Sequence, residues 1–216
     1  MSFGDKFLYW TAWIFCRGVL SLYNRLTVIG LKRALATEGP VIVAANHCSN
    51  LDPVVVGCSY PKKLRYLAKS SLFKVPILGT LIRWLGAIPA KREDAQGAAS
   101  ALKQLIGLLE SGENVLVFPE GSRSLDGKLQ PLEEGVAMLS IKTDAPIIPV
   151  WVHGSFNALP KHAKMYKPCK IVVNFGEAIH LEDFKDKTAS AKELRKMITE
   201  ELARRLLVLK EEIETC

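Results

Sequence analysis

Short runs of apolar residues alternate along this chain with stretches in which apolar positions recur every three or four residues. The runs are typical of buried strands, and the recurring positions are typical of helices that turn one face to a core. Strands are therefore predicted at residues 27–31, 41–46, 64–68, 87–89, 114–118, 147–152 and 171–175. Helices are predicted at residues 94–109, 132–142 and 194–213, the last packed on the core rather than on a membrane. Such alternation predicts a largely parallel sheet with both faces covered.

The amino terminus carries the apolar run FLYWTAWIFC, which is bounded by Lys6 and Arg17. The run is too short to cross a bilayer, which takes about 20 apolar residues. Extending it past Arg17 would bury a cation, at a cost of about 2.5–3.5 kcal/mol. No small-residue cleavage site of the signal-peptide type follows. Tyr9, Trp10 and Trp13 beside the two cations favour a helix lying in the headgroup plane of a membrane. A helix packed on the domain's own core is the alternative that the pattern leaves open.

Length and composition fit one globular domain. The chain has 216 residues, of which 49% are hydrophobic and 24% are charged, and this is long enough to bury a proper core. No repeat, low-complexity tract or linker rich in Pro, Gly or Ser divides it. The five cysteines form no C-x-x-C pair. Neither a zinc site nor a disulfide framework is favoured, and a reducing cytoplasm is the expected setting.

The net charge of +7 is concentrated in the first part of the chain. Residues 1–92 carry 13 Lys or Arg against 3 Asp or Glu, a net of +10, whereas residues 93–216 carry a net of −3. A basic front half suggests an anionic partner, such as lipid headgroups or an acidic carrier protein. Nucleic acid is disfavoured because no recognised binding motif accompanies the charge. Solvated lysines without a partner remain the alternative.

The first candidate for chemistry is the segment NHCSNLD, which follows the apolar run VIVAA. A buried strand that ends in His47 and Asp52 places reactive groups at the rim of a sheet, where open α/β sheets bind ligands. A neutral imidazole that takes a proton needs one nitrogen free and the other held by an acceptor, and a carboxylate fixes that tautomer. Asp52 also precedes Pro53, so it suits a helix N-cap, and the two uses are compatible. Cys48 lies inside the segment, but it lacks the usual surroundings of a nucleophilic cysteine.

The second candidate is FPEGSRS, which follows the apolar run VLVF. Glu120 offers acceptor oxygens for hydroxyl groups, and Gly121 can adopt a left-handed conformation that lets a ligand approach the backbone. Arg123 offers a planar fork that suits phosphate. Ser122 is not a hydrolase nucleophile, because the G-x-S-x-G pattern is absent. The two segments together indicate an enzyme that activates a hydroxyl on a phosphorylated substrate, although a tight turn with a surface arginine would also explain the second.

The two segments resemble the first and third conserved blocks of the 1-acylglycerol-3-phosphate acyltransferase (PlsC-like) family. The segment GAIPAKR resembles the second block, whose last arginine matches Arg92, and AKSSLF resembles the lysine-containing segment, matching Lys69. The segment IIPVWVHG resembles the fourth block. These matches span residues 41–154 in the family's order. Serine at position 122, where many members have threonine, is a mild departure.

The resemblance implies a single α/β domain with a mainly parallel, mixed sheet of about seven strands flanked by helices. It implies a membrane-docking helical segment at residues 1–26 and an acyltransferase domain at residues 27–216. His47 would be the general base and Asp52 its orienting partner. The acyl acceptor would be bound by Lys69, Arg92, Glu120, Gly121 and Arg123.

The implied reaction moves a fatty acyl group from an acyl thioester, acyl-CoA or acyl-ACP, to the sn-2 hydroxyl of 1-acyl-sn-glycerol 3-phosphate, giving phosphatidic acid. No cofactor and no metal are expected, because nucleotide-binding fingerprints and metal-ligand spacings are absent. The expected location is the cytoplasmic face of the cell membrane, as a peripheral or monotopic protein.

Three alternatives stay open at this point. The first is an acyltransferase with another acceptor: glycerol 3-phosphate, another lysophospholipid or a lyso-ornithine lipid. The second is a membrane-binding module without catalysis. The third is a thioesterase in which His47 activates water.

Overall fold

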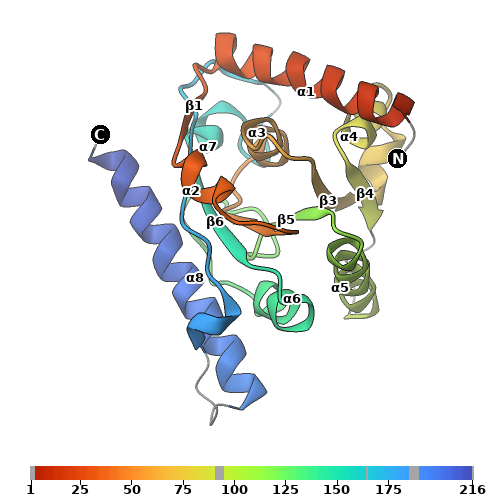
Figure 1. Cartoon of the computed structure of the whole chain (residues 1–216). Coiled ribbons are helices and arrows are strands. Elements are labelled where there is room, and N and C mark those ends of the chain that lie inside the picture. The colour runs from red at the N-terminus through yellow and green to blue at the C-terminus, as the bar shows by residue number, and fades with distance from the viewer. Residues whose placement is uncertain (1–2, 91–94, 164, 185–189, 216) are drawn as a thin grey trace.

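The computed structural model describes residues 3–90, 95–163, 165–184 and 190–215, which fold around a seven-stranded sheet (Figure 1). The strands are β1 (Thr27–Ile29), β2 (Ile42–Ala45), β3 (Leu64–Lys69), β4 (Ala87–Ala90), β5 (Asn114–Val117), β6 (Ile147–His153) and β7 (Val172–Phe175). Every predicted strand is confirmed, with its ends displaced by no more than two residues.

The strand order is β1-β7-β6-β2-β5-β3-β4. The five neighbouring strands β6, β2, β5, β3 and β4 run parallel to one another. Along the chain, a helix lies between each of the strands β2 to β5 and its successor, which is the crossover connection that parallel strands require. Strand β7 pairs antiparallel with β6, and β1 pairs parallel with β7. The predicted mainly parallel, mixed sheet is confirmed, and β2 lies in the middle of it.

Helices cover both faces of the sheet (Figure 1). The α-helices are α1 (Phe3–Tyr23), α2 (Leu31–Leu35), α3 (Asp52–Ser59), α4 (Leu78–Trp84), α5 (Ala95–Glu110), α6 (Gly135–Thr143), α7 (Ser155–Ala158) and α8 (Ala191–Glu214). Two short 3₁₀ helices, η1 (Ser70–Lys74) and η2 (Leu181–Phe184), complete the described elements. The helices predicted at residues 94–109, 132–142 and 194–213 correspond to α5, α6 and α8.

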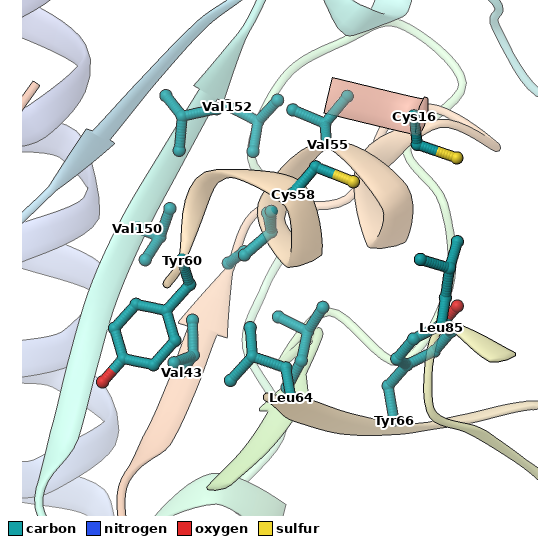
Figure 2. Close-up of a cluster of buried hydrophobic side chains, with 14 of the residues drawn as sticks. Cys16, Val43, Val55, Cys58, Tyr60, Leu64, Tyr66, Leu85, Val150 and Val152 are labelled. Atoms are coloured by element: carbon teal, nitrogen blue, oxygen red, sulfur yellow. The ribbon is translucent and has the colours of Figure 1, made fainter. Parts of the chain in front are cut away.

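Two hydrophobic cores lie on opposite sides of β2. Val43 packs with residues of α1 and α3 in one core, whereas its neighbours Ile42 and Ala44 pack with residues of α5, α6 and α8 in the other. Successive side chains of a strand point to opposite faces, so a strand buried on both sides must be apolar throughout. Figure 2 shows the first core, in which Val43 and Val150 face the helix that carries Val55.

The carboxy-terminal helix α8 is fixed at its start and along one face. The Ser190 side chain accepts the N–H of Glu193, and the Glu193 side chain accepts the N–H of Ser190 in return, which is a capping box. The buried positions recur at the predicted spacing: Ile198, Leu202, Leu206 and Leu209. The prediction of a helix packed on the core is confirmed.

Helix α1 is longer than the apolar run and continues through Arg17. One face is buried: Tyr9 is shielded from solvent, and Ala12 and Cys16 belong to the first core. The Arg17 guanidinium donates to the carbonyl oxygen of Cys58 at 2.6 Å, so the cation meets the carbonyl end of α3. The buried face of α1 therefore packs on the domain's own core, which is the alternative that the sequence pattern left open.

The opposite face of α1 exposes large apolar side chains, which include Phe15 at 66% and Leu22 at 88%. Trp10 lies on this exposed side, whereas Tyr9 and Trp13 do not. Among the residues that the structure describes, no helix has both the length and the apolar character required to traverse a bilayer.

Candidate active site

The pairing of β2 with β5 brings the two candidate segments together. Ala44 lies opposite Val117 in this parallel pair, so the same register carried three residues further puts His47 beside Glu120. The backbone N–H of His47 donates to Glu120 Oε1 at 2.5 Å, and the N–H of Ser124 donates to the His47 carbonyl oxygen at 2.8 Å. The first segment is thus held against the second through the main chain of His47.

His47 and Asp52 form a direct contact. Nδ1 of His47 lies 2.8 Å from Oδ2 of Asp52, and the Asp52 side chain is completely buried. The same oxygen accepts the backbone N–H groups of Cys48 at 2.8 Å and of Ser49 at 2.7 Å. The turn between strand and helix therefore wraps around the carboxylate, and the predicted facing of the two side chains is confirmed.

The prediction that Asp52 serves as a helix N-cap is wrong. Leu51 occupies the N-cap position of α3, Asp52 is the first helical residue, and the cap position makes no side-chain hydrogen bond. The carboxylate instead accepts the N–H groups of Cys48 and Ser49 in the preceding turn and contacts the imidazole.

The geometry fixes which nitrogen of His47 is free. An ionised carboxylate is acceptor-only, so Nδ1 carries the proton of this bond and Nε2 keeps its lone pair. The imidazole stacks on the Phe118 ring with centroids 4.0 Å apart and planes 20° apart. About a sixth of the His47 side chain (17%) is exposed. Such an imidazole has the orientation that a general base needs.

The Glu120 carboxylate is occupied by the protein itself. Besides the His47 N–H, it accepts the backbone N–H of Gln130 at 2.8 Å through Oε2. Glu120 is buried, and this burial raises the pKa of its carboxyl group, while the two backbone hydrogen bonds oppose the rise. The visible action of Glu120 is to hold the His47 segment, and its role in binding an acceptor hydroxyl stays a prediction.

Gly121 adopts the predicted left-handed conformation, with φ of +66°. A Cβ atom at this position would collide with the carboxylate of Glu133. The Glu133 N–H in turn donates to the Pro119 carbonyl oxygen at 2.8 Å, which fixes that carboxylate's backbone beside the turn. Only glycine fits here without moving a neighbour.

Arg123 lies at the rim of the site and is partly exposed. Its guanidinium donates to the side-chain oxygen of Asn50, which joins the second segment to the first by a side-chain contact. Sequence reasoning missed Asn50 as a partner, although its position inside the first segment was the available signal.

The remaining predicted cations follow neighbouring strands. Lys69 is the exposed last residue of β3, opposite Ala90 of β4, at the same carboxyl edge as His47 and Glu120. Arg92 lies outside the described residues. The carboxyl ends of parallel strands share one edge of a sheet, so the structure brings Lys69 to the edge that carries the His47–Asp52 pair.

The basic run at residues 62–65 lies at the other edge. Lys63 and Arg65 pair with Glu113 at 3.3 Å and 3.5 Å, and with Arg83 they line a cavity of about 310 Å³. These residues lie at the starts of β3 and β5, away from His47. Their predicted contact with phospholipid or a carrier protein stays a prediction.

Sequence reasoning also missed the role of Asn46. Its side-chain oxygen accepts the N–H of Val152 at 2.7 Å, and its side-chain N–H donates to the Val152 carbonyl oxygen at 3.1 Å. The amide thus continues the pairing of β2 with β6 by one more residue, and it anchors the chain immediately before His47.

The family profile described as Acyltransferase matches residues 25–153. The chain belongs to the acyltransferase family. This confirms the family that the conserved blocks predict.

Several relatives carry the name 1-acyl-sn-glycerol-3-phosphate acyltransferase. The protein of Bacillus subtilis is 28% identical over 200 residues, which cover 92% of each chain. Two chloroplast proteins, LPAT1 of Arabidopsis thaliana and BAT2 of Brassica napus, are 30% and 29% identical over 138 residues. The aligned part spans 64% of this chain but only 38% and 40% of those two proteins.

A solved structure shares the fold. The crystal structure of the 1-acyl-sn-glycerophosphate acyltransferase PlsC from Thermotoga maritima matches with a TM-score of 0.76 and 28% identity. The match covers 95% of this chain and 81% of that one. The family's α/β architecture is therefore common to both.

Replacing Glu120 by Gln tests whether this carboxylate holds the site together. We expect the free energy of unfolding to fall by about 1–3 kcal/mol, because the amide nitrogen cannot accept the second backbone N–H. Denaturant unfolding measures the change. Glu177→Gln is the control, since the Glu177 side chain is 74% exposed and such surface changes stay within about 0.5 kcal/mol. An unchanged stability in Glu120→Gln would leave only a substrate-binding role for this residue.

Cys48 offers a test of the protonation state near His47. Burial and the Asp52 carboxylate raise the pKa of the Cys48 thiol to about 12, and its sulfur lies 3.4 Å from Ser155 Oγ. We therefore expect iodoacetamide at about pH 8 to leave Cys48 unmodified in the folded protein and to alkylate it after denaturation. Peptide mass spectrometry reads the modification, with the partly exposed Cys169 as the internal reference. Rapid native modification of Cys48 would contradict the buried, protonated thiol.

Proposed function

We propose that this chain transfers a fatty acyl group from an acyl thioester to the sn-2 hydroxyl of 1-acyl-sn-glycerol 3-phosphate, which gives phosphatidic acid. The observation that carries the proposal is the 2.8 Å contact between His47 and the buried Asp52 at the carboxyl edge of the sheet. The names of the Bacillus subtilis and Thermotoga maritima relatives support the choice of acceptor.

In the proposed reaction Nε2 of His47 takes the proton from the acceptor hydroxyl as its oxygen attacks the thioester carbonyl carbon. The tetrahedral intermediate then collapses, the carbon–sulfur bond breaks, and the leaving thiolate receives the proton from the imidazolium. An ester and a free thiol result. Asp52 stabilises the imidazolium through Nδ1, and general-base assistance of this kind contributes about 10²–10⁴-fold.

The phosphate of the acceptor would be held by cations at the same edge. Arg123 has the planar donor fork for it, and Lys69 follows β3 to this edge. Arg92 completes the proposed set. Glu120 and Gly121 would shape the acceptor site, since Glu120 contacts His47 and Gly121 belongs to the turn that leads to Arg123.

The acyl group would pass directly from donor to acceptor, without an acyl-enzyme intermediate. Cys48 beside His47 is a protonated thiol at neutral pH, and Ser122 lacks the setting of a hydrolase nucleophile. The donor would be acyl-CoA or acyl-ACP, and no cofactor or metal would be required.

Residues 1–26 would dock the acyltransferase domain, residues 27–216, on the cytoplasmic face of the cell membrane. Helix α1 supports this, because its outer face exposes Phe7 (64%), Ile14 (65%) and Phe15 (66%) while its inner face packs on the core. An amphipathic arrangement of this kind suits a helix that lies in the membrane interface.

The direct test supplies purified protein with acyl thioester and lysophosphatidic acid, and measures both free thiol and phosphatidic acid. We expect His47→Ala and Asp52→Asn to lower turnover by about 10²–10⁴-fold without unfolding the protein. His162→Ala is the control, since His162 is an exposed residue of another loop. Near-normal turnover in His47→Ala would refute the mechanism.

The same assay separates the alternatives. Thiol release without an acceptor would indicate a thioesterase, and vesicle binding without thiol release would indicate a non-catalytic module. A panel of glycerol 3-phosphate, larger lysophospholipids and lyso-ornithine lipid tests the choice of acceptor.

The docking of α1 has its own test. We expect Phe15→Asp to weaken sedimentation with anionic vesicles about tenfold or more, because the variant replaces an apolar contact by a charge. Leu207→Asp on α8 is the matched control, because Leu207 is also exposed (46%) but lies over the opposite face of the sheet. Equal binding by all three proteins would rule out docking through α1.

A further inference from the structure

A second group of exposed apolar side chains runs from η1 through the following turn to the first residue of α4, beyond the carboxyl end of β3. Leu72 is 40% exposed, Val75 44%, Ile77 84% and Leu78 39%. We call residues 72–78 the apolar tip. Such large apolar side chains, gathered in one short turn, are typical of a surface that meets a partner.

The backbone of the apolar tip is strained at its most exposed residue. Ile77 has φ of +64° and ψ of −57°, and the N–H of Leu78 donates to the Pro76 carbonyl oxygen at 2.7 Å. This is a γ-turn of the rare, strained kind, with a β-branched residue at its centre. Glycine would adopt the same conformation without the steric cost. The isoleucine therefore occupies a position whose backbone conformation is sterically unfavourable for a β-branched residue.

The strained turn is part of a packed structure. The N–H of Gly79 donates to the Val75 carbonyl oxygen at 2.8 Å, and a Cβ atom on Gly79 would collide with the backbone of Phe73. Phe73 packs against the first core, and Arg83 lies over its ring at 5.5 Å. These contacts thus fix the backbone of the apolar tip while its apolar side chains stay exposed.

The position of the apolar tip links it to the chemistry and to α1. Helix η1 begins directly after Lys69, so the tip continues from the carboxyl edge that carries His47. Helix α4, which begins at Leu78, packs against α1. Helices α1 and α4 lie together on one side of the sheet, whereas α8 lies on the other (Figure 1).

The charges around the apolar tip select the partner. Lys69, Lys74 and Arg83 flank it, and no Asp or Glu occurs anywhere in residues 53–92. Apolar side chains with cations close by in the sequence match an anionic lipid surface, where the cations meet headgroups and the apolar groups enter the acyl region. Four side chains on a narrow turn are too few for a stable protein dimer, whose interface buries about 1,200–2,000 Å².

We propose that the apolar tip inserts into the membrane leaflet beside α1, as a second lipid contact. The protein then touches the bilayer at two separate places, with the edge that carries His47 and Lys69 lying next to one of them. An acceptor that is itself a membrane lipid reaches this edge without leaving the lipid surface. The inference rests on the proposed membrane docking and acyl transfer.

The test measures binding to vesicles of phosphatidylcholine containing about one third phosphatidylglycerol, a composition with a negative surface. We expect Ile77→Asp to lower the partition coefficient about tenfold or more, since one apolar side chain no longer leaves water. We expect Ile77→Gly to lower binding as well while its melting temperature stays the same or rises, because glycine relieves the backbone strain. Leu207→Asp, on the opposite face, is expected to bind like the unchanged protein.

A purely structural role for Ile77 predicts a lower melting temperature in Ile77→Gly with unchanged binding, and this result would overturn the inference. Equal binding by Ile77→Asp and the unchanged protein, when Phe15→Asp is impaired, would also overturn it and leave α1 docking intact. Failure of the unchanged protein to bind vesicles would overturn both contacts.

A parallel assay with a short-chain, water-soluble lysophosphatidic acid separates this inference from the catalytic one. Ile77→Asp is expected to keep normal turnover on that substrate and to lose turnover on the same reaction in vesicles. Absence of turnover in the unchanged protein on both substrates would refute the proposed function, whereas equal losses by Ile77→Asp on both would refute membrane contact as the role of the tip.

Discussion

The parallel pairing of β2 with β5 is the constraint on which the rest of the site depends. It brings two segments more than seventy residues apart to one edge and sets His47 level with Glu120. Each segment then holds the other through the main chain of His47, by one N–H and one carbonyl oxygen. A slip of the register by one residue would turn the imidazole to the other face of the sheet. The apolar sequence of both strands, buried on two sides, opposes such a slip.

Two buried carboxylates, Asp52 and Glu120, shape the turns on either side of this pairing. Each collects backbone N–H groups of a turn that would otherwise have no partner inside the protein. A carboxylate serves better than a neutral side chain, because it accepts several donors at once and its bonds are charge-assisted. At Asp52 the same carboxylate also holds the imidazole, so the geometry of the turn and the orientation of the imidazole have a single origin.

The sequence predicts most of this arrangement, and the failures have physical causes. Strand positions and the α8 stripe follow from periodicity, since burial on one or both faces dictates which positions are apolar. The spacing of His47 and Asp52 predicts their contact but misplaces Asp52 at the N-cap, because the choice among nearby N–H donors depends on the path of the turn. The bracing by Glu120 and the γ-turn at Ile77 depend on contacts between distant residues. The extension of α1 through Arg17 does too, because its guanidinium is satisfied by the carbonyl end of α3.

Helix α3 connects the amino-terminal helix to the site. Its last turn presents the carbonyl oxygens of Gly57 and Cys58 to Trp13 and Arg17 of α1, and its first residue is Asp52. Deleting α1 would remove the hydrogen-bond partners at the end of α3, whose first residue orients the imidazole. It would also expose apolar residues of the first core to water. The amino-terminal helix is therefore a structural part of the domain, and an unrelated helix fused in its place would not supply the same contacts to α3.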